Sequence, residues 1–192
     1  MMPNIKDLVI LTITDPARAA RDILSMNIPS EAGWTALLAV SAFNAFIFGL
    51  GDLLTPEPPD GMVLFTLTPM AFFGLLVPAL AMLVYAMYWA GRGLGGTGSL
   101  PEILTLMTWL QFVNALVRIA AVVMQLIIPV FAALLVFVAM VWGLWITANF
   151  VDQGHRLNSP LKAFGVMLAA GLGIVLALSF LITLFVGPSV GV

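Results

Sequence analysis

The sequence contains no cysteine and carries little charge. Only 8% of its 192 residues are Asp, Glu, Lys or Arg, whereas 62% are hydrophobic and the mean hydropathy is +1.13. A soluble domain carries roughly 25% charged residues, so this chain lacks the polar surface needed to face water on all sides. The missing cysteines exclude disulfides, thiolate nucleophiles and cysteine-ligated metals, and a net charge of −2 gives no basic field for nucleic acid. The composition predicts an integral membrane protein that does not bind nucleic acid.

Five long apolar runs separate the few charged residues. Each run is long enough for a helix that crosses the hydrocarbon, which needs about 20 residues. The runs lie near residues 33–51, 69–90, 103–127, 130–150 and 163–186. The predicted fold is all-α: an N-terminal segment of residues 1–32, a bundle of five transmembrane helices in residues 33–187, and a tail of residues 188–192.

Positive charges predict the orientation of this bundle. Six of the seven Lys and Arg residues fall on one side of a five-span arrangement: Lys6, Arg18, Arg21, Arg92, Arg156 and Lys162. The connections on the other side contain no Lys or Arg, and the first of them holds Asp52, Glu57 and Asp60. Because cytoplasmic loops are rich in Lys and Arg, the N-terminus is predicted to be cytoplasmic and the C-terminus periplasmic or outside.

Three local patterns predict where helices begin. Asp15 followed by Pro16 is typical of a helix start, and a short amphipathic helix reaching about Met26 would lie on the membrane surface. Ser99 and Glu102 have the spacing of a capping box, and Ser159 precedes a proline in the same way.

Small residues recur every four positions on several predicted helices. Such ridges let helix backbones approach closely, which matters in lipid because apolar burial does not drive helix association there. The candidate packing residues are Ser41, Ala45 and Gly49 in the first span, Ala139, Gly143 and Thr147 in the fourth, and Gly165, Ala169, Gly173 and Ala177 in the fifth. These ridges are expected to face other helices, within the bundle or in an oligomer.

The third span carries a polar stripe. Gln111, Asn114, Arg118 and Gln125 are offset by 3, 7 and 14 residues, which confines them to a sector of roughly 60° on a helix. A cation near the midplane is costly, so Arg118 is expected to face the bundle and meet a carboxylate or carbonyls. Asp52 is the acidic candidate on that side, and Asn44 and Asn149 are further polar candidates.

Two interpretations of the stripe stay open. It could form a pathway or a site at which Arg118 contacts an anion or a lipid phosphate. It could instead be a structural network, of Asn44, Asp52, Gln111, Asn114, Arg118 and Gln125, that only fixes helix packing.

Catalytic patterns are weak. Residues 49–52 match the surroundings of one aspartate in intramembrane aspartyl proteases, but the second aspartate that the chemistry requires is missing, since Asp152 falls on the opposite membrane face. Glycines 91, 93 and 96 follow a membrane helix rather than a strand, so they predict a flexible loop and not a dinucleotide site. The single histidine, His155, is interpreted as a loop residue. No enzyme activity, metal or cofactor is expected.

The order of these features resembles the bacterial branch of the Yip domain family, the Ypt/Rab-interacting membrane proteins. The resemblance rests on Asp15-Pro16 before an amphipathic stretch, on five spans, on the glycine-rich segment 91–99, and on Ser159 to Ala163 opening the last span. It implies a multipass protein of the bacterial inner membrane. The Asp-Leu-Tyr-Gly-Pro type of motif found in eukaryotic relatives is absent, so small GTPase binding is not expected.

Two functions are compatible with the sequence. The first is a non-enzymatic organising, assembly or trafficking-like factor that contacts lipids and forms a homo- or hetero-oligomer with other membrane proteins. The alternative is a small-solute permease or a lipid- or anion-binding protein that uses the polar stripe.

Overall fold

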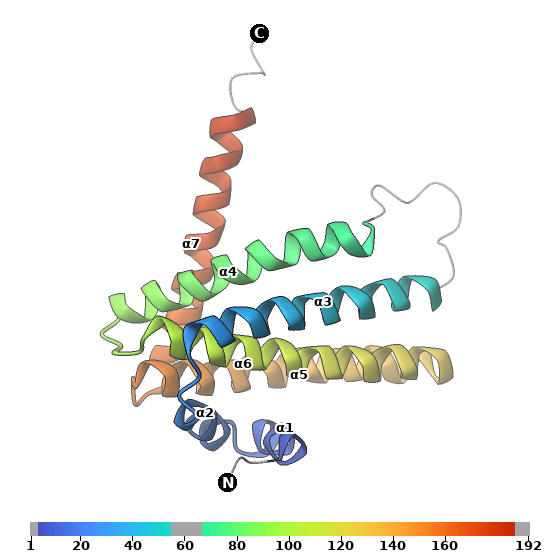
Figure 1. The fold of residues 1–192 in the computed structure, drawn as a ribbon, viewed down its shortest axis with the longest axis horizontal. Coiled ribbons are helices and arrows are strands. Elements are labelled where there is room, and N and C mark those ends of the chain that lie inside the picture. The colour runs from blue at the N-terminus through green and yellow to red at the C-terminus, as the bar shows by residue number, and fades with distance from the viewer. Residues whose placement is uncertain (1–3, 55–66, 187–192) are drawn as a thin grey trace.

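The residues that the computed structural model describes, 4–54 and 67–186, form helices and the short segments that connect them. Two short helices precede five long ones (Figure 1). The helices are α1 (Ile5–Thr14), α2 (Pro16–Ser25), α3 (Ser30–Leu54), α4 (Pro69–Gly93), α5 (Leu100–Ile127), α6 (Pro129–His155) and α7 (Pro160–Val186). The predicted tail, residues 188–192, and the acidic residues Glu57 and Asp60 lie outside the described residues.

The five long helices confirm the five predicted spans, because each is long and apolar enough to cross a membrane. Their starts follow the predicted signals. The Glu102 carboxylate accepts a hydrogen bond of 2.8 Å from the Ser99 N–H at the start of α5. The Ser159 hydroxyl accepts one of 3.4 Å from the Lys162 N–H in α7. These side chains stabilise the helix starts because the first N–H groups of a helix have no partner within it.

The N-terminal segment contains one helix more than the sequence predicts. Helix α2 occupies the predicted amphipathic stretch, and the Asp15 side chain caps it by accepting from the Arg18 N–H at 3.1 Å. Helix α1 was not predicted, because its many β-branched residues have only moderate helix propensity. Contacts with the bundle hold it: Trp109 Nε1 donates to the Thr12 hydroxyl at 2.9 Å, and Trp142 Nε1 donates to the Ile13 carbonyl at 3.1 Å.

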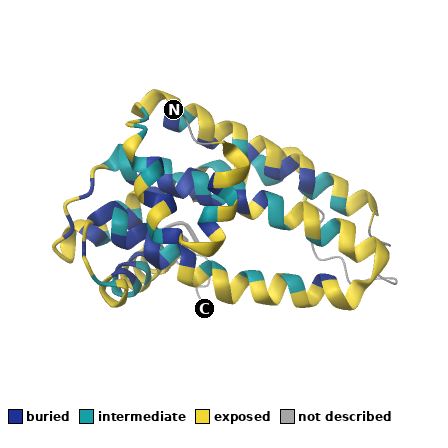
Figure 2. Ribbon diagram, turned by 90° about the horizontal axis from the view of Figure 1, so that it is seen from below, coloured by how far each residue is buried: buried dark blue, intermediate teal, exposed yellow. Residues whose placement is uncertain are grey.

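The core lies at one end of the bundle. We call it the connection end, because residues 94–99 and 156–159 link α4 to α5 and α6 to α7 there. Figure 2 shows buried residues gathered at this end, whereas the opposite, far end is mostly exposed. Fully buried core residues such as Ile103, Leu106 and Phe150 all lie in the half of α5 or α6 nearest the connections. The helices are therefore held together most tightly at the connection end.

Helix α7 leaves the other long helices. It begins at the connection end, where Ala163, Val166 and Ala170 are buried, and then runs away from the direction of α3, α5 and α6 (Figure 1). Farther along, its large apolar side chains are exposed, and Leu176 is 68% exposed. The second half of α7 thus presents an apolar surface that no other described part of the chain covers.

Gly154 allows α6 to approach α5 at the connection end. A Cβ atom at this position would lie 2.9 Å from the Cδ1 atoms of both Ile103 and Leu106. We expect Gly154→Val to lower the free energy of unfolding by about 1–3 kcal/mol, as overpacking does in cores. Thermal unfolding of the purified protein in detergent measures the change.

Gly143→Val is the matched control for this prediction. Gly143 lies on the same helix, and nothing lies within 4 Å of its Cβ position. The control is expected to unfold at nearly the wild-type temperature, and an equal loss of stability in both variants would contradict a close crossing at Gly154.

Candidate functional site

His155 is the most enclosed polar side chain at the connection end. It is the last residue of α6 and has no exposed surface. Its Nε2 atom lies 3.1 Å from the Met87 carbonyl of α4, and its own carbonyl accepts from the Thr97 N–H at 2.9 Å. Its Nδ1 atom is buried without a hydrogen-bond partner among the residues described. The interpretation of His155 as a loop residue was wrong, because His155 is the last residue of α6 and its imidazole is buried against α4.

Three glycines form the seat of this imidazole. A Cβ at Gly91 would collide with the ring, and one at Gly96 would lie 2.9 Å from Nδ1. A Cβ at Gly98 would lie 3.0 Å from Nδ1 and would also collide with the Gly154 carbonyl. The expectation of a flexible loop at Gly91, Gly93 and Gly96 was wrong for Gly91 and Gly93, which lie in the last turn of α4. Gly96 lies in the α4–α5 connection and packs on His155.

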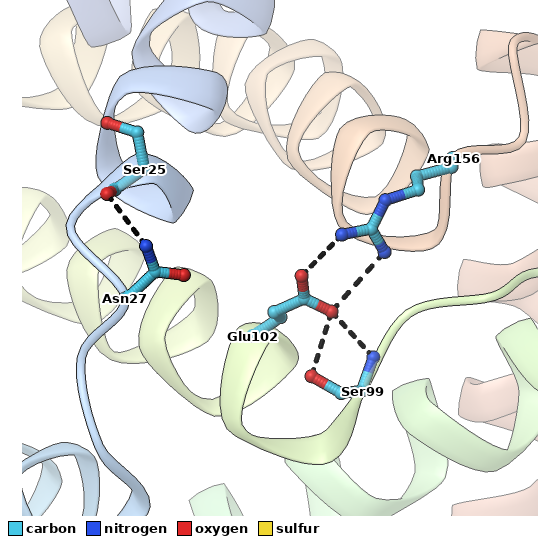
Figure 3. A network of polar contacts seen from close by, with 5 residues as sticks. All are labelled: Ser25, Asn27, Ser99, Glu102 and Arg156. Atoms are coloured by element: carbon cyan, nitrogen blue, oxygen red, sulfur yellow. Dashed lines mark hydrogen bonds and ion pairs between the residues drawn. The ribbon is translucent and has the colours of Figure 1, made fainter.

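An ion pair closes the outer side of the connection end. Figure 3 shows the Glu102 carboxylate between Arg156 and Ser99. Glu102 Oε2 accepts from Arg156 Nη1 at 3.3 Å and from the Ser99 N–H and hydroxyl at 2.8 Å each, and Oε1 pairs with Arg156 Nη2. The hydrogen bond to Glu102 raises the pKa of Arg156 above its ordinary value. This pair joins the start of α5 to the end of α6.

Asp152 links α6 to the residues just before α7 and, through Gln153, to α2. Its Oδ1 atom accepts from the Ser159 N–H at 2.7 Å, just before α7, and its Oδ2 atom accepts from Gln153 Nε2 at 3.0 Å. Gln153 Oε1 in turn accepts from Arg21 Nη1 of α2 at 3.2 Å. The buried carboxylate of Asp152 thus fixes the α6–α7 turn and, through Gln153, contacts α2.

These polar groups are engaged in structural contacts. Glu102 is ion-paired and Asp152 accepts from two donors. Among the described residues, no group of three His, Cys, Asp or Glu side chains could hold a metal ion. Asp52 is near the far end of α3, whereas Asp152 is at the connection end of α6 (Figure 1), so the two do not form a protease dyad.

The predicted polar network is spread over the surface and the interior. Asn44 is buried, and its Nδ2 donates to the Val40 carbonyl of its own helix at 2.9 Å. Asn149 likewise donates to the Trp145 carbonyl at 2.8 Å. Gln111 is partly buried, whereas Asp52, Asn114, Arg118 and Gln125 are exposed. This single chain does not bury the stripe and its expected partners together.

Arg118 and Asp52 nevertheless lie along one hollow of about 340 Å³ between α3 and α5. Ile47, Phe48 and Val122 supply apolar walls. Because both charged groups are exposed, this hollow opens at the surface of the bundle rather than between its helices.

The small-residue ridge of α3 faces other helices. Ser41 and Ala45 are buried, and a Cβ at Gly49 would lie 2.6 Å from Cγ of Pro69, at the start of α4. The Ser41 hydroxyl donates to the Leu37 carbonyl at 2.7 Å, so no polar group is left free on this ridge. The close approach of α3 to the start of α4 at Gly49 thus depends on the absence of a side chain there.

The ridge of α7 borders an open groove. Gly165 packs near Leu94, whose Cδ1 atom would be 3.7 Å from an added Cβ, and nothing lies within 4 Å of the corresponding position at Gly173. A groove of about 660 Å³ lies between α4 and α7. Its lining includes Tyr85 and Trp89 on α4 and Ala169, Gly173 and Ala177 on α7.

The sequence reasoning missed the contacts that hold the connection end together. No residue close to His155 in the sequence indicates its packing partners, because the glycines that contact the imidazole are more than fifty positions earlier. The pairing of Glu102 with Arg156 likewise joins two distant segments. The one usable signal was the cluster of glycines itself, because close packing is an alternative reason for glycine in a loop.

The glycine seat yields a stability prediction. We expect Gly91→Ala to lower the free energy of unfolding by about 1–3 kcal/mol, because its Cβ collides with the imidazole. Gly93→Ala is the matched control, since nothing lies within 4 Å of its Cβ position. Thermal unfolding in detergent compares the two. In the double variant with His155→Ala, the added cost of Gly91→Ala should largely vanish, and full additivity would contradict the seat.

Comparison with known proteins identifies the family. A family profile described as the Yip1 domain matches residues 10–182 of the chain. No curated protein and no solved structure matches it. The profile spans α2 to α6 completely, half of α1 and most of α7, and five helices in the described residues can cross a membrane. The chain is therefore a multipass membrane protein that belongs to the Yip1 domain family.

Proposed function

We propose that this protein is a non-enzymatic factor of the bacterial inner membrane that assembles with membrane proteins through the groove between α4 and α7. The observation that carries the proposal is the departure of α7 from the bundle, which leaves the α4–α7 groove open along the ridge of Ala169, Gly173 and Ala177. The occupant is another transmembrane helix, from a second copy or from a different membrane protein.

The chemistry of the groove suits a helix. Small residues let a neighbouring backbone come close, and dispersion contacts then drive association within lipid. Tyr85 and Trp89, which are 45% and 67% exposed, offer large flat surfaces on the opposite wall. A partner helix would fill the space between the two walls.

The polar groups of the connection end support a role without catalysis. His155 is buried between α4 and α6, and the Glu102 carboxylate is bound by Arg156 and Ser99. A catalytic acid, base or nucleophile needs access to substrate. These groups instead support the shape of the assembly surface.

A second candidate function is binding of an anion or lipid phosphate at Arg118. The observation that favours it is that Arg118 is exposed in a hollow on the surface of the bundle. A solute permease has less support, because a conduit needs polar groups enclosed between helices and Arg118 is exposed. If the Arg118→Met variant still folds and assembles but no longer binds the anion or lipid phosphate, this second candidate is favoured.

The assembly proposal predicts a strong effect at Gly173. Gly173→Leu would fill the groove with a bulky side chain, and we expect it to abolish the oligomer or the co-purified membrane partner. The fold should be unchanged, because nothing lies within 4 Å of the added Cβ. Crosslinking in native membranes followed by purification measures the assembly, and thermal unfolding checks the fold.

Gly171→Leu is the control for that experiment. It lies on the same helix, is exposed and has nothing within 4 Å of its Cβ position, but it does not line the groove. We expect it to keep the assembly. A monomeric wild-type protein without any crosslinked neighbour, or equal assembly of both variants, would overturn the proposal.

The inner-membrane orientation is testable because the chain has no native cysteine. A single cysteine at Asn158→Cys, exposed at the connection end, is expected to react with a membrane-impermeant maleimide only after the cells are opened. Leu67→Cys, just before α4 at the far end, should react in intact cells. The reverse pattern would show the opposite orientation.

A further inference from the structure

A partly open apolar cavity lies beside the N-terminal helices. It has a volume of about 370 Å³ and is lined by residues of α1, α2, the α2–α3 connection, α3 and α5. Leu8, Ile28, Ala36 and Phe112 are among its lining residues. Its volume falls in the range of about 300–1,000 Å³ typical of sites for small ligands.

One polar side chain in this cavity has no partner. Thr108 on α5 lines it and is only 6% exposed, and its hydroxyl is buried without a hydrogen bond to any described residue. Other threonines of the bundle, such as Thr35 and Thr147, donate to the carbonyl four residues earlier. An unpaired buried hydroxyl is costly, and because Thr108 lines the cavity, a ligand bound there is the candidate acceptor for its proton.

A small polar hollow adjoins the apolar cavity. It measures about 200 Å³ and shares three lining residues with the cavity, Ile23, Ile28 and Thr105. Its polar walls are Asn27, Ser99 and Glu102. Figure 3 shows Asn27 facing Glu102 from the opposite side, with its amide nitrogen turned back to the Ser25 carbonyl at 3.1 Å.

The two sides of the hollow are hydrogen-bond acceptors. The Asn27 side-chain oxygen points toward the Glu102 side, and Glu102 presents a carboxylate (Figure 3). A molecule between them would therefore meet them with N–H or O–H donors. The hollow is also at the connection end, beside the α2 surface helix.

We propose that the cavity and the hollow together bind one zwitterionic aminophospholipid. One acyl chain fills the apolar cavity, and the primary ammonium group donates to Asn27 and Glu102 in the hollow. The Thr108 hydroxyl donates to an ester carbonyl of the lipid. Thr108 is six residues deeper along α5 than Glu102, about 9 Å at 1.5 Å per residue, in the order in which headgroup and ester follow each other in a lipid.

The experiment uses the full chain in nanodiscs that contain equal amounts of phosphatidylethanolamine and phosphatidylcholine. The protein is released into mild detergent, and the lipids that stay bound are counted by native mass spectrometry. The choline headgroup has no N–H donor, so we expect about one retained lipid per chain and about a fivefold preference for phosphatidylethanolamine. Equal retention of the two lipids, or none, would overturn the proposal.

Matched variants test the polar hollow. Asn27 has a left-handed backbone, with φ of 48°, so Asn27→Gly removes the amide without strain and should reduce the headgroup preference to near one. Asn158→Gly is the control, because Asn158 has φ of 53° and lies outside the hollow. An unchanged preference in Asn27→Gly would contradict the headgroup assignment.

Two further variants test the cavity. Ala36→Trp fills the space for the acyl chain and should abolish retention, while Thr108→Val keeps the space and should weaken retention about fivefold. Thr35→Val is the control on an exposed threonine of α3. Thermal unfolding identifies any variant that fails to fold, and Thr108→Val then decides the test. Wild-type retention in folded Ala36→Trp or in Thr108→Val would overturn the cavity site.

The lipid proposal and the assembly proposal fail separately. The cavity lies between the N-terminal helices and α3 and α5, whereas the assembly groove lies between α4 and α7. Lipid retention can therefore be lost while the crosslinked oligomer is kept. The oligomer can likewise be lost while lipid retention is kept.

Discussion

The burial of His155 on a seat of glycines is the contact on which the rest of the bundle depends. Its imidazole reaches the Met87 carbonyl of α4, and its backbone carbonyl binds the α4–α5 connection. Glycines at 91, 96 and 98 leave the room for this ring. The end of α6, the end of α4 and the start of α5 are thereby fixed relative to each other.

From this fixed end the helices acquire different roles. Helices α5 and α6 stay together because Gly154 lets them approach, and the Glu102–Arg156 pair joins them at the surface. Asp152 fixes the turn into α7, after which α7 leaves the bundle (Figure 1). The N-terminal helices are held against α5 and α6 by Trp109 and Trp142, and the partly open cavity lined by Thr108 lies beside this contact. Beside the tight core the bundle thus has two openings, the α4–α7 groove and the cavity lined by Thr108.

More of the fold of this Yip1 family member than of its candidate sites could be predicted from the sequence. Long apolar runs and capping signals such as Ser99 with Glu102 are local, so the five long helices and their starts follow from neighbouring residues. Helix α1 could not be predicted in this way, because its stability comes from Trp109 and Trp142, far along the chain. The polar stripe of α5 shows the same limit: spacing assigns its residues to one face, but that face can turn toward a helix, a cavity or lipid.

The sequence by itself determined that the protein belongs in a membrane, how many helices can cross it and where those helices begin, since hydrophobic length and helix capping depend on residues close together in the chain. Only the tertiary structure decided that His155 is buried, that Arg118 is exposed and that α7 leaves the bundle. The physical reason is that burial is a property of the neighbours a side chain meets. Those neighbours lie in segments that are far apart in the sequence. Close packing at glycines brings these segments together.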